Sequence, residues 1–238
     1  MAASREWTIA HSPGARASRG ERWAASDEDL AGADLDLVDV WLTRAPSRRL
    51  IVLGDAGAGK SELMVRTLLV LLDRRADFGD VVPALVPVAS WDFGDVEAWL
   101  ERWLVRNYRF LGRTAPGDGA GSYARELLRN NRIAVILDGF DELPPDNRKR
   151  FLQWLNHDGN DDRPQRMLLL TSRPVEYARL ALDQESIRLD GAAGVRLLPQ
   201  RTGDVVGFLR LKSGPGRWDG VAASIEKGGR SPLSLKRR

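Results

Sequence analysis

The chain has 238 residues, of which 43% are hydrophobic, enough for one large domain with a sizeable core. It contains no cysteine, which excludes disulfides and thiolate metal sites, and its formal net charge is only +3. No apolar run is long enough to span a membrane, and the first residues lack the apolar core of a secretory signal. These features predict a cytoplasmic protein without a membrane segment.

Residues 1–21 are polar and show no periodicity, so we expect a flexible N-terminal segment. A helix is predicted next, capped by Ser26 and stopped by Pro46. Its apolar positions follow near-helical spacing: Leu30, Leu35, Val38 and Leu42. We expect this short helix to pack beside the strand that follows it.

The most informative stretch begins with an apolar strand, residues 50–53, and continues as Gly54-Asp-Ala-Gly-Ala-Gly-Lys-Ser, a phosphate-binding loop pattern. Its glycines let backbone N–H groups surround phosphate oxygens, and a helix over residues 60–73 adds its dipole there. Lys60 would contact the β and γ phosphates, and the Ser61 hydroxyl would ligate Mg²⁺. The predicted nucleotide-binding residues are Gly54, Asp55, Ala56, Gly57, Ala58, Gly59, Lys60, Ser61 and Glu62.

Three further elements are predicted before the next motif. Residues 81–89 form a strand whose two prolines favour a sheet edge. Asp95 caps a helix over residues 95–110, and Ser122 begins a short one ending near residue 130. The longer helix has a broad apolar face, which we interpret as core: Trp99, Leu100, Trp103, Leu104 and Phe110.

The third predicted strand consists of five apolar residues, 133–137, and ends in Asp138. This pattern predicts a buried strand that delivers a carboxylate to the C-terminal edge of a parallel sheet. Asp138 would hold the Mg²⁺ shell, while Asp141 or Glu142 would orient or deprotonate the attacking water. A helix from Pro144 follows. A fourth strand, residues 167–172, ends in the hydroxyl pair Thr171-Ser172 and leads to Arg173, whose guanidinium would sense the γ phosphate. Residues 195–198 form a fifth strand, and Thr202 caps a last helix.

Three of these segments together resemble the Walker A, Walker B and sensor 1 motifs of NACHT nucleoside triphosphatases, which are STAND-class signalling ATPases related to AAA+ proteins. The segments are Gly54-Asp-Ala-Gly-Ala-Gly-Lys-Ser, Ile136-Leu-Asp-Gly-Phe-Asp-Glu-Leu and Leu170-Thr-Ser-Arg-Pro. The resemblance covers residues 22–235. It implies a three-layer α/β P-loop fold with a five-stranded parallel sheet in the order 5-1-4-3-2, flanked by helices.

The resemblance also implies what the residues do. Lys60 and Ser61 would hold phosphate and Mg²⁺, Asp138 would bind Mg²⁺ through water, Asp141 or Glu142 would serve hydrolysis, and Arg173 would sense the γ phosphate. Pro232, in Ser231-Pro232-Leu233, resembles the proline that family members keep near adenine. The expected function is ATP or ADP binding with Mg²⁺, slow hydrolysis, and nucleotide-controlled homo-oligomerisation in defence or other signalling.

The predicted organisation is a flexible segment (1–21), a NACHT-type domain (22–211) and a basic segment (212–238) that starts a truncated helical domain. Two alternatives remain. Residues 201–238 hold nine basic and three acidic groups. The protein could therefore instead be a non-hydrolysing interaction module that holds nucleotide as a structural element and whose basic C-terminus contacts a partner or nucleic acid. As an expected partner, nucleic acid ranks below ATP and a second copy of the chain, because no nucleic-acid-binding motif accompanies the basic residues of this segment. An AAA+ motor ranks third, since no arginine finger or pore loop is evident.

Overall fold

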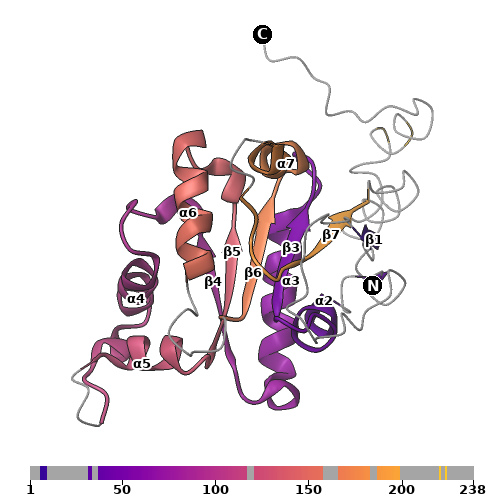
Figure 1. The fold of residues 1–238 in the computed structure, drawn as a ribbon. Helices are drawn as coiled ribbons and strands as arrows, with labels where there is room; N and C mark the ends of the chain where they lie inside the picture. Colours follow the sequence, from indigo (N-terminus) through magenta and orange to yellow (C-terminus); the bar gives the residue numbers. More distant parts are fainter. Residues whose placement is uncertain are drawn as a thin grey trace.

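The computed structural model describes residues 6–9, 32–33, 37–116, 121–157, 166–182, 187–198, 220 and 223. A central sheet runs through the molecule in the order β2-β1-β7-β3-β6-β5-β4 (Figure 1). Five neighbouring strands are parallel: β3 (Arg49–Leu53), β4 (Val82–Pro87), β5 (Ile133–Asp138), β6 (Leu168–Ser172) and β7 (Ala193–Leu197). Numbered along the chain, these five follow the order 5-1-4-3-2, so the expected parallel α/β architecture is confirmed.

Two antiparallel strands extend this sheet beyond β7. Strand β1 (Glu6–Ile9) pairs with β7, and β2 (Gly32–Ala33) pairs with β1. Strand β1 falls within residues 1–21, for which the sequence analysis expects no regular structure. The difference has a physical reason, because an unpaired edge of β7 offers hydrogen bonds to any extended segment, and such distant pairing leaves no local pattern in the sequence.

Helices cover both faces of the sheet, as a parallel sheet requires. In Figure 1, α4, α5 and α6 lie to the left of the strands and α2 to the right. The first face carries α4 (Val96–Asn107), α5 (Tyr123–Arg129), α6 (Pro145–His157) and α7 (Pro174–Leu182). The second carries α2 (Leu37–Asp39), the π-helical turn η2 (Val40–Arg44) and α3 (Lys60–Asp73). Short 3₁₀ turns complete the connections: η3 (Arg75–Phe78), η4 (Val88–Ser90), η5 (Arg109–Gly112) and η6 (Phe140–Glu142).

Each central strand contributes side chains alternately to two hydrophobic cores. In β5, Ile133, Val135 and Leu137 pack toward α4–α7, whereas Ala134 and Ile136 pack toward α2 and α3. All five are buried. This two-sided burial explains why the central strands read as continuous apolar runs, and it fixes the positions of the residues that follow each strand.

Most predicted elements are present in the structure. The helix predicted between Ser26 and Pro46 is wrong over its first part, because Gly32–Ala33 form strand β2 through pairing with the distant β1. In this stretch the described helical residues are those of α2 and η2. Helix α3 begins at Lys60 and β4 lies at the sheet edge, both as predicted. The expected apolar face of α4 is wrong at Phe110, which is 66% exposed, because the helix ends at Asn107 and the chain turns into η5. Ser26 and the helix from Thr202 lie outside the described residues. None of the helices in the described part of the chain is long and apolar enough to cross a membrane.

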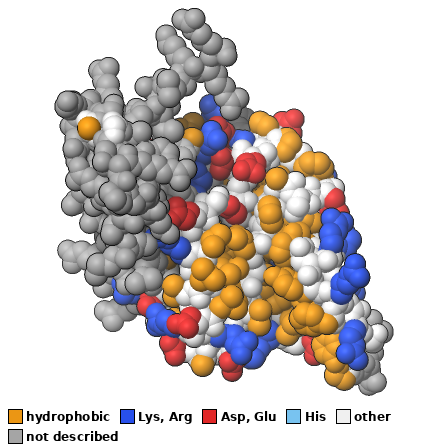
Figure 2. Space-filling model, turned by 180° about the vertical axis from the view of Figure 1, so that it is seen from behind, with side chains coloured by type: hydrophobic (Ala, Val, Ile, Leu, Met, Phe, Trp, Pro, Cys, Tyr) orange, Lys and Arg blue, Asp and Glu red, His pale blue; other side chains and the backbone are white. Residues whose placement is uncertain are grey.

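Helix α3 leaves an apolar strip on its outer side. Val65, Leu69 and Leu72 are 45%, 57% and 47% exposed, and their spacing places them on one side of the helix. The face seen in Figure 2 carries a broad hydrophobic area with basic side chains along its right and lower margins. Such exposed apolar surface is typical of contact surfaces.

Replacing Asp95 by Ala should lower the free energy of unfolding by about 1 kcal/mol, because Asp95 Oδ1 accepts the Ala98 N–H at 2.7 Å and caps α4. Urea unfolding followed by tryptophan fluorescence measures the change. Asp95→Asn is the matched control, since asparagine also caps helices and should retain most of the stability. Equal losses in both variants would contradict the capping role.

Candidate functional site

Three strand ends meet at one edge of the sheet. Strand β6 lies between β3 and β5, and Leu53 is paired in register with Ser172. Leu137 is paired with Leu170, so Asp138 lies level with Thr171. Three features therefore lie next to one another at the carboxyl edge of the sheet. They are the loop that starts at Gly54, the carboxylate of Asp138, and Arg173, the residue after β6. The sequence-predicted residues on these three segments belong to one site.

The loop from Gly54 to Gly59 depends on its glycines in two different ways. Gly57 and Gly59 have φ angles of 76° and 80°, the left-handed region that favours glycine, and Gly59 is the N-cap of α3. At Gly54 the requirement is steric, because neighbouring side chains leave little room for a Cβ atom. A Cβ atom there would lie 3.2 Å from the side chains of Ala58, Lys60 and Leu197. The loop consequently lies tight against the end of β7.

Lys60 folds back across this loop. Its Nζ donates to the carbonyl oxygens of Gly54 at 2.7 Å and Asp55 at 3.2 Å, which holds the ammonium group over the loop. Ser61 is exposed in the first turn of α3, and Glu62 pairs with Arg66 along the helix. The arrangement gives the first turn of α3 a cation and a hydroxyl at the N-terminal, positive end of the helix dipole, the chemistry that binds phosphate.

A fully buried hydroxyl ties β5 to β6. Thr171 Oγ1 donates to Asp138 Oδ1 at 2.6 Å and accepts the backbone N–H of Gly139 at 2.8 Å. This fixes the Asp138 carboxylate at the strand end and leaves its second oxygen for another partner. A serine hydroxyl and a carboxylate are oxygen ligands of the kind Mg²⁺ prefers, so Ser61 and Asp138 fit the ion.

Asp141 and Arg173 form an ion pair at the same edge. Arg173 Nε lies 2.8 Å from Asp141 Oδ2, and the backbone N–H of Arg173 donates to Asp141 Oδ1 at 3.2 Å. The Asp141 side chain is 7% exposed, whereas that of Arg173 is 52% exposed. The acid is therefore fixed, while the guanidinium still reaches solvent and can meet a ligand.

Gly139 and Phe140 set the course of the acidic turn η6. Gly139 has a φ of 85°, and a Cβ atom there would lie 2.9 Å from Glu142 Cδ, so only glycine allows Glu142 to fold back. Phe140 is completely buried and packs against Phe151 and Tyr177. This anchor holds the exposed carboxylate of Glu142 beside the strand ends. Pro232 lies outside the described residues.

Sequence reasoning missed Arg148, which holds this corner together from α6. Its side chain is buried, with Nε donating to Leu143 O at 2.9 Å and Nη2 to Asp141 O at 2.7 Å. Nη1 pairs with Glu176 of α7 at 2.5 Å, and this hydrogen bond lowers the pKa of Glu176 below its ordinary value. The surrounding apolar helix pattern offers no signal for such a role, because a helical arginine is usually solvated.

Arg196 of β7 is a second residue that the sequence analysis missed. Its Nη2 lies 4.0 Å from Asp55 Oδ2, and its side chain is 53% exposed. The register pairs Arg196 with Leu53, directly before the phosphate loop. A cation therefore borders the loop on the side opposite Arg173, and only the pairing of β7 with β3 brings it there.

Strand β3 leads directly into the glycine loop, and β6 and β5 place Thr171, Arg173 and Asp138 at the same edge of the parallel sheet. This fold and site together define a P-loop nucleoside triphosphatase. The family model of the NACHT domain matches residues 48–192, more than half of the chain, and the protein belongs to the NACHT family. A comparison with curated proteins finds no match.

Comparison with solved structures finds matches at low identity, including the following two. The ADP form of the ORC2 protein from Aeropyrum pernix has 16% identity and a TM-score of 0.49, covering 75% of this chain and 50% of its own. Cdc6p from Pyrobaculum aerophilum has 16% identity and a TM-score of 0.46, covering 85% of this chain and 53% of its own. The chain thus spans about half the length of these proteins.

Replacing Glu176 by Gln should lower stability at neutral pH, and the loss should shrink in acid. A carboxyl group with a lowered native pKa stabilises the fold above its unfolded pKa, and this contribution disappears as the pH falls through the native pKa. Urea unfolding of both proteins at pH 7 and below pH 4 tests the prediction. A difference independent of pH would show that the Arg148 pair contributes no charge-dependent stability.

Proposed function

We propose that the protein is a nucleotide switch that binds ATP or ADP with Mg²⁺ at the loop of residues 54–62 and hydrolyses ATP slowly. One observation carries the proposal, namely the meeting of the Lys60 loop, Asp138 and the Asp141–Arg173 pair at one sheet edge. A structural nucleotide would need only the loop. The additional acids and the exposed arginine favour hydrolysis over the alternative of a non-hydrolysing module.

In this proposal each residue has a distinct task. The loop N–H groups and the first turn of α3 bind the phosphates, and Lys60 exchanges its two loop carbonyls for phosphate oxygens. Ser61 and Asp138 would hold Mg²⁺, which when bound neutralises phosphate charge. Asp141 or Glu142 would orient the attacking water or accept its proton. Arg148 keeps both acids in position through the Asp141 and Leu143 carbonyls.

The Asp141–Arg173 pair gives the switch a physical basis. A γ phosphate offers the guanidinium a stronger partner than a single carboxylate does, because its oxygens carry more charge. Arg173 would then move toward ATP and leave Asp141 free to act on water. With ADP, the pair at 2.8 Å would persist. Nucleotide state would thereby change the start of α7, which directly follows Arg173.

We further propose that the switch acts through homo-oligomerisation in cytoplasmic defence or other signalling, as the NACHT resemblance implies. The exposed strip of α3, formed by Val65, Leu69 and Leu72, supports a contact surface of this kind. It lies on the helix that begins at the phosphate loop, so bound nucleotide and self-association would involve the same element.

Substituting both Asp141 and Glu142 by Ala should leave nucleotide binding intact and lower ATP turnover at least about a hundredfold, the usual contribution of a general base. Released phosphate measures turnover, and fluorescent ATP titration measures binding. Asp146→Ala removes an exposed carboxylate from the start of α6 and should change neither. Unchanged turnover in the double variant would remove both acids from the mechanism.

Substituting Lys60 by Ala should abolish tight nucleotide binding, because the loop loses its only side-chain cation. Purified protein is denatured, and any released nucleotide is identified by chromatography. ADP or ATP carried by the original protein and absent from the variant supports the adenine site. Protein that carries no nucleotide and fails to bind added ATP with Mg²⁺ would contradict the proposal for this chain.

Substituting Leu69 by Glu should abolish nucleotide-dependent self-association without affecting ATP binding, because a charge at the centre of the α3 strip opposes apolar contact. Light scattering after size exclusion, with ATP or ADP present, measures the mass. Ala76→Glu adds the same charge at an exposed position of η3 and is the matched control. Equal masses for the original and Leu69→Glu proteins under each nucleotide would exclude this strip.

A further inference from the structure

A second pocket lies at the edge of the sheet opposite the phosphate loop. It has a volume of about 540 Å³, within the range of small-molecule sites. Four of its lining residues each directly precede a parallel strand: Arg48 before β3, Val81 before β4, Arg132 before β5 and Met167 before β6. The pocket therefore belongs to the amino ends of the strands and is separate from the nucleotide site.

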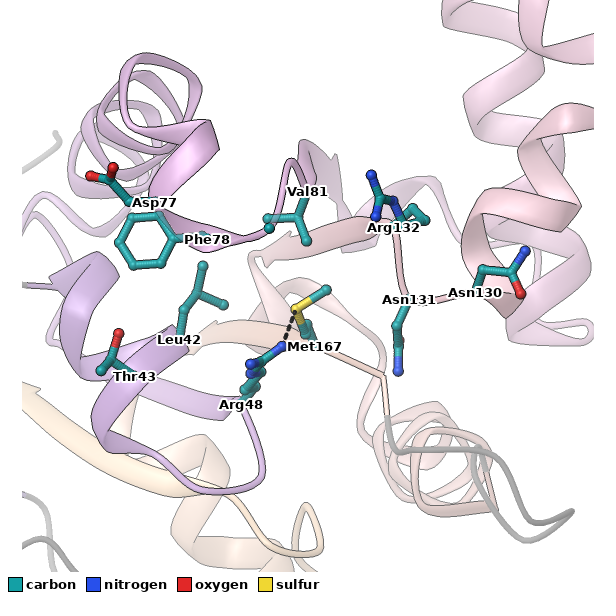
Figure 3. Close-up of a pocket in the computed structure, with 11 residues that line it drawn as sticks. Leu42, Thr43, Arg48, Asp77, Phe78, Val81, Asn130, Asn131, Arg132 and Met167 are labelled. Carbon is teal, nitrogen blue, oxygen red and sulfur yellow. Dashed lines mark hydrogen bonds between the residues drawn. The ribbon is translucent and has the colours of Figure 1, made fainter.

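The pocket combines an apolar floor with a cationic rim. Leu42, Val81 and Met167 are almost completely buried and form the floor, together with the half-buried ring of Phe78. In Figure 3, Arg48 faces Met167 near the centre, with Leu42 and Phe78 on one side and Asn131 and Arg132 on the other. The polar residues of the rim are Thr43, Arg48, Asp77, Asn130, Asn131 and Arg132.

The two arginines retain their capacity to bind an anion. Arg48 Nη1 donates only to Met167 Sδ, at 3.8 Å, and a thioether is a weak acceptor. Within the described ranges neither Arg48 nor Arg132 is in an ion pair. Asp77, the one acid of the lining, already pairs with Arg74 at 3.1 Å. The rim thus carries a net positive charge and lies next to an apolar surface.

Arg48 is also held in place by the fold. Its φ of 53° is in the left-handed region, which is unusual for arginine. Its carbonyl oxygen accepts the indole N–H of fully buried Trp41 at 2.8 Å and the N–H of Leu168 at 2.9 Å. Its own N–H donates to Ala45 O at 2.9 Å. The side chain therefore starts from a fixed point at the pocket rim, which lowers the entropic cost of binding.

We propose that this pocket binds a small organic anion, a carboxylate or phosphate carried on an aromatic or aliphatic group. The guanidinium groups of Arg48 and Arg132 receive the anion through charge-assisted hydrogen bonds, since their planar forks match its oxygens. Phe78, Leu42 and Met167 receive the apolar part. The proposal is independent of nucleotide binding, because none of its residues belongs to the loop or the acidic turn.

The three methionines of the chain allow a direct test. Met167 forms part of the pocket floor, whereas Met64 is a buried residue of α3, one turn after Lys60, and does not line the pocket. Protein labelled with ¹³C at the methionine methyl groups is titrated with phenylacetate to about 10 mM, a range that captures a Kd near 1 mM. Phenylacetamide, of the same shape without charge, and phenyl phosphate are titrated in parallel. Met167→Leu assigns the signal.

We expect phenylacetate, phenyl phosphate or both to shift the Met167 signal saturably while phenylacetamide binds at least about fivefold more weakly, as the loss of a charge-assisted bond implies. Phenyl phosphate is titrated in Lys60→Ala protein to keep it from the phosphate loop. Comparison of the Kd values for phenylacetate and phenyl phosphate shows whether the pocket prefers a carboxylate or a phosphate. The Met64 signal should stay in place under phenylacetate.

Two variants connect the binding to the arginines. Arg48→Asn keeps a residue that tolerates the left-handed backbone, and Arg132→Gln keeps a polar side chain. Each should raise the Kd at least about fivefold. Arg150→Gln on α6, outside the pocket, should not change it. The proposal is overturned by a Met167 signal that does not move with either anion, by equal binding of phenylacetamide, or by equal Kd values in the Arg48, Arg132 and Arg150 variants.

Discussion

The insertion of β6 between β3 and β5 is the constraint on which the site depends. Gly54 N donates to Ser172 O at 3.1 Å on one side of β6, and buried Thr171 holds both Asp138 and the Gly139 N–H on the other. These bonds align the phosphate loop, the Asp138 carboxylate and Arg173 along one sheet edge. Without β6, the loop would not be held beside Asp138 or the acidic turn.

The acidic turn is held by apolar anchoring and by one buried cation. Phe140 fixes the backbone from the core side, and Arg148 joins η6 to α7 through the carbonyls of Asp141 and Leu143 and the carboxylate of Glu176. A buried arginine without partners would strongly destabilise the fold. Arg148 has partners in both η6 and α7, so its hydrogen bonds link these two elements. The backbone position of Asp141 thus depends on Phe140 and Arg148 as well as on Arg173.

The sheet has two edges with different chemistry. Its amino edge carries Arg48, Arg132 and the floor of a pocket, and its carboxyl edge carries Lys60, Asp138 and Arg173. Strand β3 joins Arg48 to the phosphate loop through five residues, about 17 Å of extended chain. Strands β5 and β6 likewise start at the pocket and end at the acids and the arginine. The same three rigid strands thus connect both edges.

The sequence by itself determined the elements whose signals are local: the glycine loop between β3 and α3, the caps Asp95 and Ser122, and the apolar runs that become central strands. The order of the parallel strands followed from family resemblance. Only the tertiary structure decided the Asp141–Arg173 pair, the clamp of Arg148, the exposure of Phe110, the added strand β1 and the pocket at the amino edge. The physical reason is that caps and strands depend on neighbours in sequence, whereas these features join residues that only packing brings together.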